Sequence, residues 1–195
     1  CCPARHAVVA RLARTLGLMN DIVLRPLEEA PPAELASLQS AAFSDFVQSP
    51  QLAEVLASES AGRFHAASPQ VHAPFGLAAF RGEVLVGWSQ GYREGTNQFY
   101  VLKSGVTSAE RRKGVYTLLV KALLVHAESQ GYSTVRSRHT AANTAVIIAK
   151  LKLGFQVSGF EYSEVYGPLV QLTYLVGEAR RKLYSTRAAP IRPLQ

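Results

Sequence analysis

The sequence predicts one α/β domain, in the broad sense that includes α+β folds, with a mixed central sheet of about six to seven strands and helices on both faces. The length of 195 residues is typical of a single domain. Hydrophobic residues make up 48% of the chain and charged residues 18%, and this composition of a packed globular protein excludes a disordered chain. From residue 21 onward, strand-like and helix-like patterns alternate, which indicates a sheet with helices packed on it.

The first half of the domain is expected to hold one strand, two helices and then three strands. Leu35, Leu38 and Ala42 recur at helical spacing after Pro32. Two apolar runs that flank a short Gly-containing turn predict a hairpin. The expected elements are a strand at 22–27, a helix at 32–43, a short helix after Pro50, hairpin strands at 75–80 and 84–92, and a strand at 98–106.

The second half is expected to contain two further helices and three further strands. In residues 111–130 apolar side chains recur with helical periodicity, and Gly131 supplies a stop signal. A second stop signal, Gly154, ends the next helix. The expected elements are helices at 111–130 and 143–153, and strands at 133–138, 155–162 and 169–176.

The net charge of +7 lies in the two ends of the chain. Residues 1–19 hold three arginines and no acid, residues 177–195 hold five basic residues and one acid, and residues 20–176 are balanced at zero. We therefore divide the chain into an N-terminal extension (1–19), a domain (20–176) and a basic C-terminal tail (177–195). The extension resembles a targeting segment or is an artefact of the assigned start. Because the domain has no basic surplus, we expect no nucleic-acid partner.

The cysteine count and the apolar runs argue against a disulfide-rich protein, a thiolate metal site and a membrane-spanning protein. The two cysteines are Cys1 and Cys2, so neither a disulfide framework nor a thiolate metal site is expected. A cysteine-free body suits a reducing compartment, and we predict a cytoplasmic location. The apolar run 115–127 is interrupted by Lys121 and is shorter than the ~18 residues of a membrane-spanning helix. We therefore expect no membrane span and no metal.

The segment 101–117, VLKSGVTSAERRKGVYT, predicts an anion site. A strand there enters a helix through a basic turn, and the first amides of a helix lack partners within it and carry a partial positive charge. Gly114 lets the backbone approach an anion closely. The segment matches neither the P-loop nor the dinucleotide fingerprint, and a solvated basic turn is the alternative interpretation.

The pattern Arg111-x-x-Gly114-x-Tyr116 resembles the acetyl-CoA signature of the GNAT (Gcn5-related N-acetyltransferase) superfamily, Gln/Arg-x-x-Gly-x-Gly/Ala. Asn143 and Gly154-Phe155 stand where this superfamily has further characteristic residues. The resemblance covers roughly residues 20–176 and implies the GNAT fold, with acetyl-CoA as the co-substrate. Tyr116 departs from the signature, and its ring must point away from the phosphates.

The resemblance also implies which residues contact acetyl-CoA. The end of the fourth strand pairs with the pantetheine arm, the amides at the start of the next helix hold the pyrophosphate, and Asn143 bonds the arm near the thioester. The implied contacts are Ser104, Gly105, Val106, Arg111, Arg112, Lys113, Gly114, Val115, Tyr116, Thr117 and Asn143.

Acetyl transfer to an amine requires a base for the amine, a donor for the oxyanion and a group that neutralises the departing thiolate. The Val106 amide is the oxyanion candidate. Relatives often have a Glu base and a Tyr acid where this chain has Arg138 and Lys150. We expect these two cations to face one cleft near the thioester, where they favour a neutral amine and an acidic acceptor, with Lys150 also stabilising the thiolate. The alternative is that Arg138 pairs with Glu161 and Lys150 extends into solvent.

Histidine suits a base because its ordinary pKa is near 6.5, and His139 is predicted at the end of a strand near the reaction centre. A loop histidine without a role is the alternative. The candidate catalytic residues are therefore Val106, Arg138, His139 and Lys150. Other titratable candidates are Tyr100, Glu161, Tyr162 and Glu164.

The sequence thus predicts an N-acetyltransferase that transfers the acetyl group of acetyl-CoA to a primary amine by direct attack in a ternary complex. Direct attack is favoured because no cysteine lies near the motif. The acceptor is expected to be a small-molecule or peptide amine, and the two cations favour one that carries an acidic group. The alternative is a non-catalytic acyl-CoA-binding or regulatory domain. The apolar strand at 169–176 is either interior or part of a homodimer interface.

Overall fold

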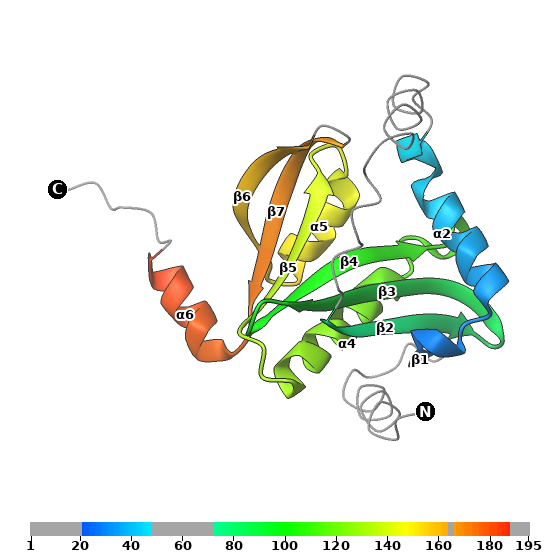
Figure 1. Ribbon diagram of the computed structural model, residues 1–195, viewed down its shortest axis with the longest axis horizontal. Helices are drawn as coiled ribbons and strands as arrows, with labels where there is room; N and C mark the ends of the chain where they lie inside the picture. The colour runs from blue at the N-terminus through cyan, green and yellow to red at the C-terminus, as the bar shows by residue number, and fades with distance from the viewer. Residues whose placement is uncertain (1–20, 48–71, 164–165, 188–195) are drawn as a thin grey trace.

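The computed structural model describes residues 21–47, 72–163 and 166–187 (Figure 1). Strands and helices alternate along these residues, as the sequence predicts. The elements are β1 (Ile22–Pro26), α2 (Pro32–Val47), β2 (His72–Arg81), β3 (Val84–Glu94), β4 (Gln98–Val106), α4 (Val115–Ser129), β5 (Thr134–Thr140), α5 (Thr144–Lys152), β6 (Gln156–Ser163), β7 (Gly167–Leu175) and α6 (Glu178–Arg187).

The strands form one seven-stranded mixed sheet in the order β1-β2-β3-β4-β5-β7-β6. Each neighbouring pair is antiparallel except β4 and β5, which are parallel. The mixed sheet of six to seven strands is confirmed. Strand β7, which contains most of the segment 169–176, lies between β5 and β6, so this segment is interior to the sheet.

Strands β4 and β5 pair over only three positions, from Gln98 opposite Thr134 to Tyr100 opposite Arg136. Beyond Tyr100 the two strands diverge, as Figure 1 shows. We call the opening between residues 101–106 of β4 and residues 137–140 of β5 the wedge. One edge of β4 therefore lacks a neighbouring strand along the wedge.

Helices cover both faces of the sheet because its strands place apolar side chains alternately on either side. On β2, Leu77 and Ala79 face α4 in the larger core cluster, whereas Ala78 and Phe80 face α2 in a smaller cluster with Trp88. Helix α5 lies on the face of α4, since its side chain Ile147 and the C-cap residue Leu153 pack against the larger cluster. The prediction of helices on both faces is confirmed.

One predicted helix boundary is wrong. The helix expected at 111–130 begins only at Val115. Arg112 has φ +64° and Gly114 has φ +86°, and these left-handed conformations are incompatible with a right-handed helix. Residues 111–114 therefore form a turn. The short helix predicted after Pro50 and the extension 1–19 lie outside the described residues.

The described part of the basic tail is α6, which contacts the sheet through Arg181. The Arg181 guanidinium donates hydrogen bonds to Tyr174 Oη at 2.9 Å and to the Leu175 carbonyl at 3.0 Å. It also lies over the Tyr174 ring, with 5.2 Å to the centroid. These contacts attach the first half of the tail to β7. None of the described helices has the length and apolar character needed to cross a bilayer.

Candidate active site

The wedge opens into a groove of about 940 Å³, a volume in the range of small-molecule sites. The groove is lined by the end of β4, the turn before α4, the first turn of α4 and one side of α5, together with Ala42 of α2 and Thr140 at the end of β5. Nine of the predicted cofactor contacts line it: Ser104, Gly105, Val106, Arg111, Arg112, Gly114, Tyr116, Thr117 and Asn143.

Two backbone amides of β4 point into the wedge. The Thr107 amide donates to the Val86 carbonyl on β3 at 2.9 Å, and successive amides of a strand point to opposite edges. The amides of Val106 and Ser104 therefore point away from β3, toward the edge without a neighbouring strand. The Ser104 side chain is held separately by Ser89, with 2.6 Å between the two hydroxyl oxygens. This geometry suits the predicted backbone contacts with an extended ligand arm.

The turn before α4 presents unpaired amides and positive charge. Gly114 is the N-cap of α4 and provides no side-chain cap, so the first amides of the helix remain for a ligand. Arg111 reaches back to the wedge, where its Nε donates to the Val106 carbonyl at 3.4 Å. Amides and arginines together make this turn suitable for a phosphate group.

Glu110 connects the turn before α4 to β2 through hydrogen bonds to Arg81. Its side chain is nearly buried and accepts two hydrogen bonds from Arg81, at 3.2 and 2.7 Å, and one from Lys113 at 3.4 Å. The Arg81 hydrogen bond is the main cause that lowers the pKa of Glu110, so the carboxylate is charged at neutral pH. Arg81 also pairs with Asp21. Glu110 and Arg81 stand far apart in the sequence, and no motif connects them.

Two predicted cofactor side chains do not line the groove. Lys113 is turned toward Glu110, and the Val115 side chain is buried in the larger core cluster. Tyr116 does line the groove, while its ring packs against the same cluster. Its hydroxyl is buried without a hydrogen-bond partner, and burial raises the pKa of Tyr116 well above its usual range.

Asn143 caps helix α5 and also lines the groove. Its Oδ1 accepts a hydrogen bond from the Val146 amide at 3.4 Å, which makes it the N-cap of α5. It also lines the groove. The side-chain amide group is thus a candidate donor to the ligand arm, while the carbonyl oxygen caps the helix.

We expect Asn143→Ala and Asn143→Asp to weaken acetyl-CoA binding by about tenfold, the cost of one lost hydrogen bond. Only Asn143→Ala should also lower the melting temperature, because aspartate still caps the helix. Calorimetric titration and thermal unfolding of both variants separate the two roles. Unchanged affinity in both variants would limit Asn143 to capping.

The expectation that Arg138 and Lys150 face one cleft is wrong. Successive residues of a strand point to opposite faces, and Lys150 contacts Ser137, the neighbour of Arg138 on β5. Arg138 lies on the opposite face and pairs with Glu161 at 2.8 Å, which was the alternative for this residue. Lys150 does not extend into solvent either, because it is fully buried.

Lys150, Ser137 and His139 form a hydrogen-bonded chain under the wedge. Lys150 Nζ donates to Ser137 Oγ at 2.7 Å and lies 4.8 Å from the centroid of the Phe155 ring. Burial lowers the pKa of Lys150 to about 7. His139 Nε2 lies 3.1 Å from Ser137 Oγ, and burial together with Lys150 lowers the pKa of His139 to about 3. A histidine that holds a proton so weakly, outside the groove lining, does not fit the predicted base.

We expect Lys150→Met to stabilise the protein by about 2 kcal/mol at neutral pH, because a buried ammonium without a carboxylate is costly and methionine has a similar shape. The pKa of Lys150 is about 7 in the folded protein against an ordinary value of 10.5. Between these values the unfolded chain binds the extra proton, so the wild-type stability should rise with pH across this window. Urea unfolding at pH 6.5 and 9.5 should give a rise about 3 kcal/mol larger for wild type than for Lys150→Met. Equal rises would place a compensating charge near Lys150.

The described residues contain no cluster of three or more His, Cys, Asp or Glu side chains that could hold a metal ion. The groove combines a free strand edge with a basic helix N-terminus, and this combination suits an extended, phosphate-bearing ligand. The model of the acetyltransferase (GNAT) family matches residues 34–155. The chain belongs to this family.

Solved structures of this family share the fold. Ard1 from Thermoplasma volcanium superposes with a TM-score of 0.59 at 19% identity, covering 81% of this chain and 99% of that one. The ribosomal-protein-S18-alanine N-acetyltransferase from Escherichia coli gives 0.60 at 14% identity, with coverage of 80% and 97%. A GNAT family acetyltransferase from Elizabethkingia anophelis with acetyl-CoA bound gives 0.56 at 13% identity, with coverage of 80% and 99%. Comparison with proteins of curated function gives no match.

Proposed function

We propose that this protein transfers the acetyl group of acetyl-CoA to a primary amine by direct attack in a ternary complex. The observation that carries the proposal is the wedge, where the free edge of β4 leads directly to the basic N-terminus of α4. An acyl-CoA molecule has the matching parts, since its amide-containing arm pairs with a strand edge and its pyrophosphate with a helix N-terminus.

The shape of the wedge determines the orientation in which we propose that acetyl-CoA binds. The pyrophosphate lies at residues 111–117, and the arm runs along β4 past Val106 and Ser104. Tyr100 closes the wedge roughly 20 Å from Val106, at ~3.3 Å per residue. In this orientation the Val106 amide donates a hydrogen bond to the part of the arm near the phosphates, and the acetyl group lies closer to Tyr100. The proposal therefore has the oxyanion form deeper in the wedge than Val106, the residue predicted from the sequence.

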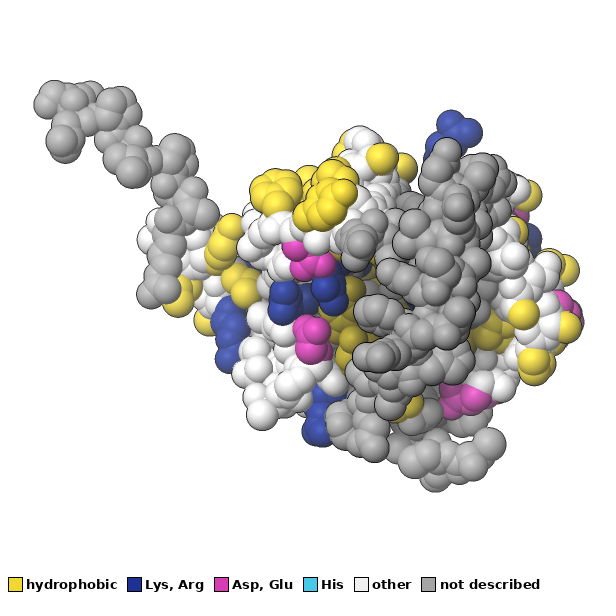
Figure 2. Space-filling model, turned by 45° about the horizontal axis from the view of Figure 1, so that its top comes forward, with side chains coloured by type: hydrophobic (Ala, Val, Ile, Leu, Met, Phe, Trp, Pro, Cys, Tyr) yellow, Lys and Arg dark blue, Asp and Glu magenta, His cyan; other side chains and the backbone are white. Residues whose placement is uncertain are grey.

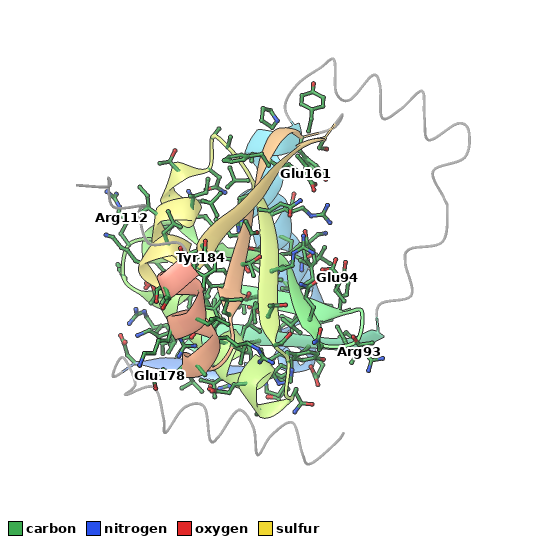
Figure 3. All side chains as sticks on the ribbon, turned by 90° about the vertical axis from the view of Figure 1, so that its left-hand side faces the viewer. Arg93, Glu94, Arg112, Glu161, Glu178 and Tyr184 are labelled. Atoms are coloured by element: carbon green, nitrogen blue, oxygen red, sulfur yellow. The ribbon has the colours of Figure 1, made fainter. Side chains whose placement is uncertain are left out.

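The acceptor approaches from the other side of the sheet. In Figure 3, Arg112 in the turn lies on one side of the sheet, whereas Glu94 and Glu161 lie on the other. Among the described elements, α4 and α5 pack on the first side of the sheet, and α2 packs on the second side over β2, β3 and β4. The β5, β7 and β6 part of this second side is where an amine reaches the thioester.

The acceptor of this proposal is a small-molecule or peptide amine. An acidic group on it is not part of the proposal, because the acidic preference depends on two unpaired cations, and Arg138 is paired while Lys150 is buried. A cytoplasmic location, which the cysteine-poor body favours, and action without nucleic acid or membrane belong to the same proposal. Sedimentation would decide between a monomer and a homodimer.

The test is release of CoA thiol from acetyl-CoA by the full chain across a panel of amines, with mass spectrometry of each product. We expect amine-dependent thiol release and an acetylated product for at least one primary amine. Tight acetyl-CoA binding without turnover across the panel would instead favour the non-catalytic acyl-CoA-binding domain. In favour of that second function, this chain has Arg138 and Lys150 where the family resemblance leads us to expect a Glu base and a Tyr acid.

A further inference from the structure

We propose that Tyr100 is the proton-transfer residue of the acetyl transfer, and that Arg138 and Glu161 are positioning residues that hold its hydroxyl. This inference rests on the proposed function. It is carried by the place of Tyr100 in the wedge and by a chain of hydrogen bonds across four strands.

Tyr100 stands at the closed end of the wedge. It is the last residue of β4 that pairs with β5. Its neighbours Phe99 and Val101 belong to the core cluster on the α4 side, so the Tyr100 side chain points to the opposite side of the sheet. There it shares a face with Arg138, on the side from which the acceptor approaches. Tyr100 is buried, with 8% of its surface exposed, and it lies at the closed end of the wedge, on the side from which the proposed acceptor approaches.

The hydrogen bond to Tyr100 has a defined direction. Arg138 Nε lies 3.1 Å from Tyr100 Oη, and the guanidinium carbon lies 5.1 Å from the centroid of the Tyr100 ring. A guanidinium only donates, so the tyrosine oxygen is the acceptor. The hydroxyl proton of Tyr100 is left to be donated to a third group, and a positive charge stands beside the oxygen that releases it.

The position of Arg138 is held by Glu161 on the edge strand β6. Its Nη1 donates to Glu161 on β6 at 2.8 Å, and Gln171 on β7 donates to the other carboxylate oxygen at 2.7 Å. The Arg138 hydrogen bond is the main cause that lowers the pKa of Glu161, and the same contact raises the pKa of Arg138. Both groups are thus charged at neutral pH. Figure 2 shows acidic and basic side chains gathered together on this face.

The proposed step balances without a further reactant. The amine nitrogen attacks the acetyl carbon, the carbon–sulfur bond breaks, and sulfur keeps the electron pair. The Tyr100 hydroxyl gives its proton to sulfur, which yields the free thiol of CoA. The nitrogen of the new amide loses one proton to the Tyr100 oxygen, which restores the phenol. The net result is transfer of one proton from nitrogen to sulfur.

Tyr100→Phe removes the hydroxyl and keeps the ring. We expect kcat with the best amine to fall about 100-fold, the usual contribution of a proton-transfer group, with the Kd for acetyl-CoA unchanged. Tyr92→Phe is the matched control. Tyr92 faces Tyr100 from β3, with 5.5 Å between the ring centroids, and its hydroxyl has no part in the step, so kcat should be that of wild type.

The positioning role is tested at Glu161. Glu161→Gln keeps an oxygen that accepts from Arg138, whereas Glu161→Ala removes it. We expect kcat to fall about tenfold more in Glu161→Ala than in Glu161→Gln, with unchanged KM for acetyl-CoA. Equal losses in the two variants would contradict the positioning role.

Wild-type turnover separates this inference from the proposed function. If wild type acetylates an amine and Tyr100→Phe does so at the wild-type rate, the role of Tyr100 is wrong and the proposed function holds. If wild type binds acetyl-CoA but acetylates no amine of the panel, the proposed function fails, and the role of Tyr100 fails with it. A loss of activity in Tyr92→Phe equal to that in Tyr100→Phe would also overturn the inference, because it would show a general effect of losing a hydroxyl on this face.

Discussion

Gly114→Glu is expected to abolish acetyl-CoA binding, with a Kd at least about 100-fold higher than that of wild type. Gly114 has φ +86° and caps α4 at the point where the amides of the turn meet the groove. A glutamate there places a negative charge where the pyrophosphate binds, and its side chain occupies space in the groove. The left-handed conformation costs any residue with a Cβ roughly 1–2 kcal/mol, a loss of stability that does not by itself unfold a domain.

Gly131→Glu is the matched control. Gly131 follows the same helix, has φ +75°, and has open space around a Cβ. It therefore takes a similar conformational cost and the same change of charge, at the end of α4 remote from the groove. Calorimetric titration of both variants should give normal affinity for Gly131→Glu and none for Gly114→Glu. Normal affinity in folded Gly114→Glu would place the cofactor elsewhere.

Gly91→Ala is expected to lower the free energy of unfolding by about 3 kcal/mol, the upper end of the cost of overpacking. A Cβ at Gly91 would lie 2.2 Å from the Tyr100 carbonyl oxygen and 2.6 Å from the Phe99 ring. The carbonyl belongs to the backbone of β4, so it moves only if the strand moves. Urea unfolding measures the loss.

The matched control for Gly91 is Gly159→Ala on the edge strand β6. A Cβ at Gly159 would meet only the Gln171 side chain, at 3.4 Å, so a change of about 0.5 kcal/mol or less is expected. Because Gly91 lies opposite β4 at an irregularity in the ladder, Gly91→Ala should also reduce turnover through a displaced Tyr100. An unchanged stability of Gly91→Ala would contradict the close approach of the two strands.

The order of the strands and helices follows from hydrophobic periodicity, and most of it is predictable from the sequence. The start of α4 is less predictable, because the apolar pattern begins only at Val115 and the polar residues 111–114 give no periodic signal for or against a helix. Arg112 is the instructive case, since a non-glycine residue with φ +64° leaves no trace in the pattern. The length of the β4–β5 ladder is equally invisible, because the divergence of two strands depends on what packs between them.

The backbone part of the site is predictable because a motif places it. Ser104, Val106 and Gly114, which the family resemblance predicts as acetyl-CoA contacts, line the groove. The side chains that control charge are not predictable in this way. Arg138 and Lys150 fall on opposite faces of β5, and Glu110 meets Arg81 from a distant part of the chain. Such pairs depend on three-dimensional proximity, and a single sequence gives no signal for them.

Hydrogen–deuterium exchange of the wild-type protein with and without acetyl-CoA tests the central claim most directly. The amides of Ser104 and Val106 face the wedge without a strand beside them, and the first amides of α4 lack partners within the helix. We predict that acetyl-CoA slows exchange in peptides that cover residues 104–106 and 112–117, and leaves the β1–β2 ladder unchanged. Binding that protects other segments, or no protection in these two, would contradict the assignment of the wedge as the cofactor site.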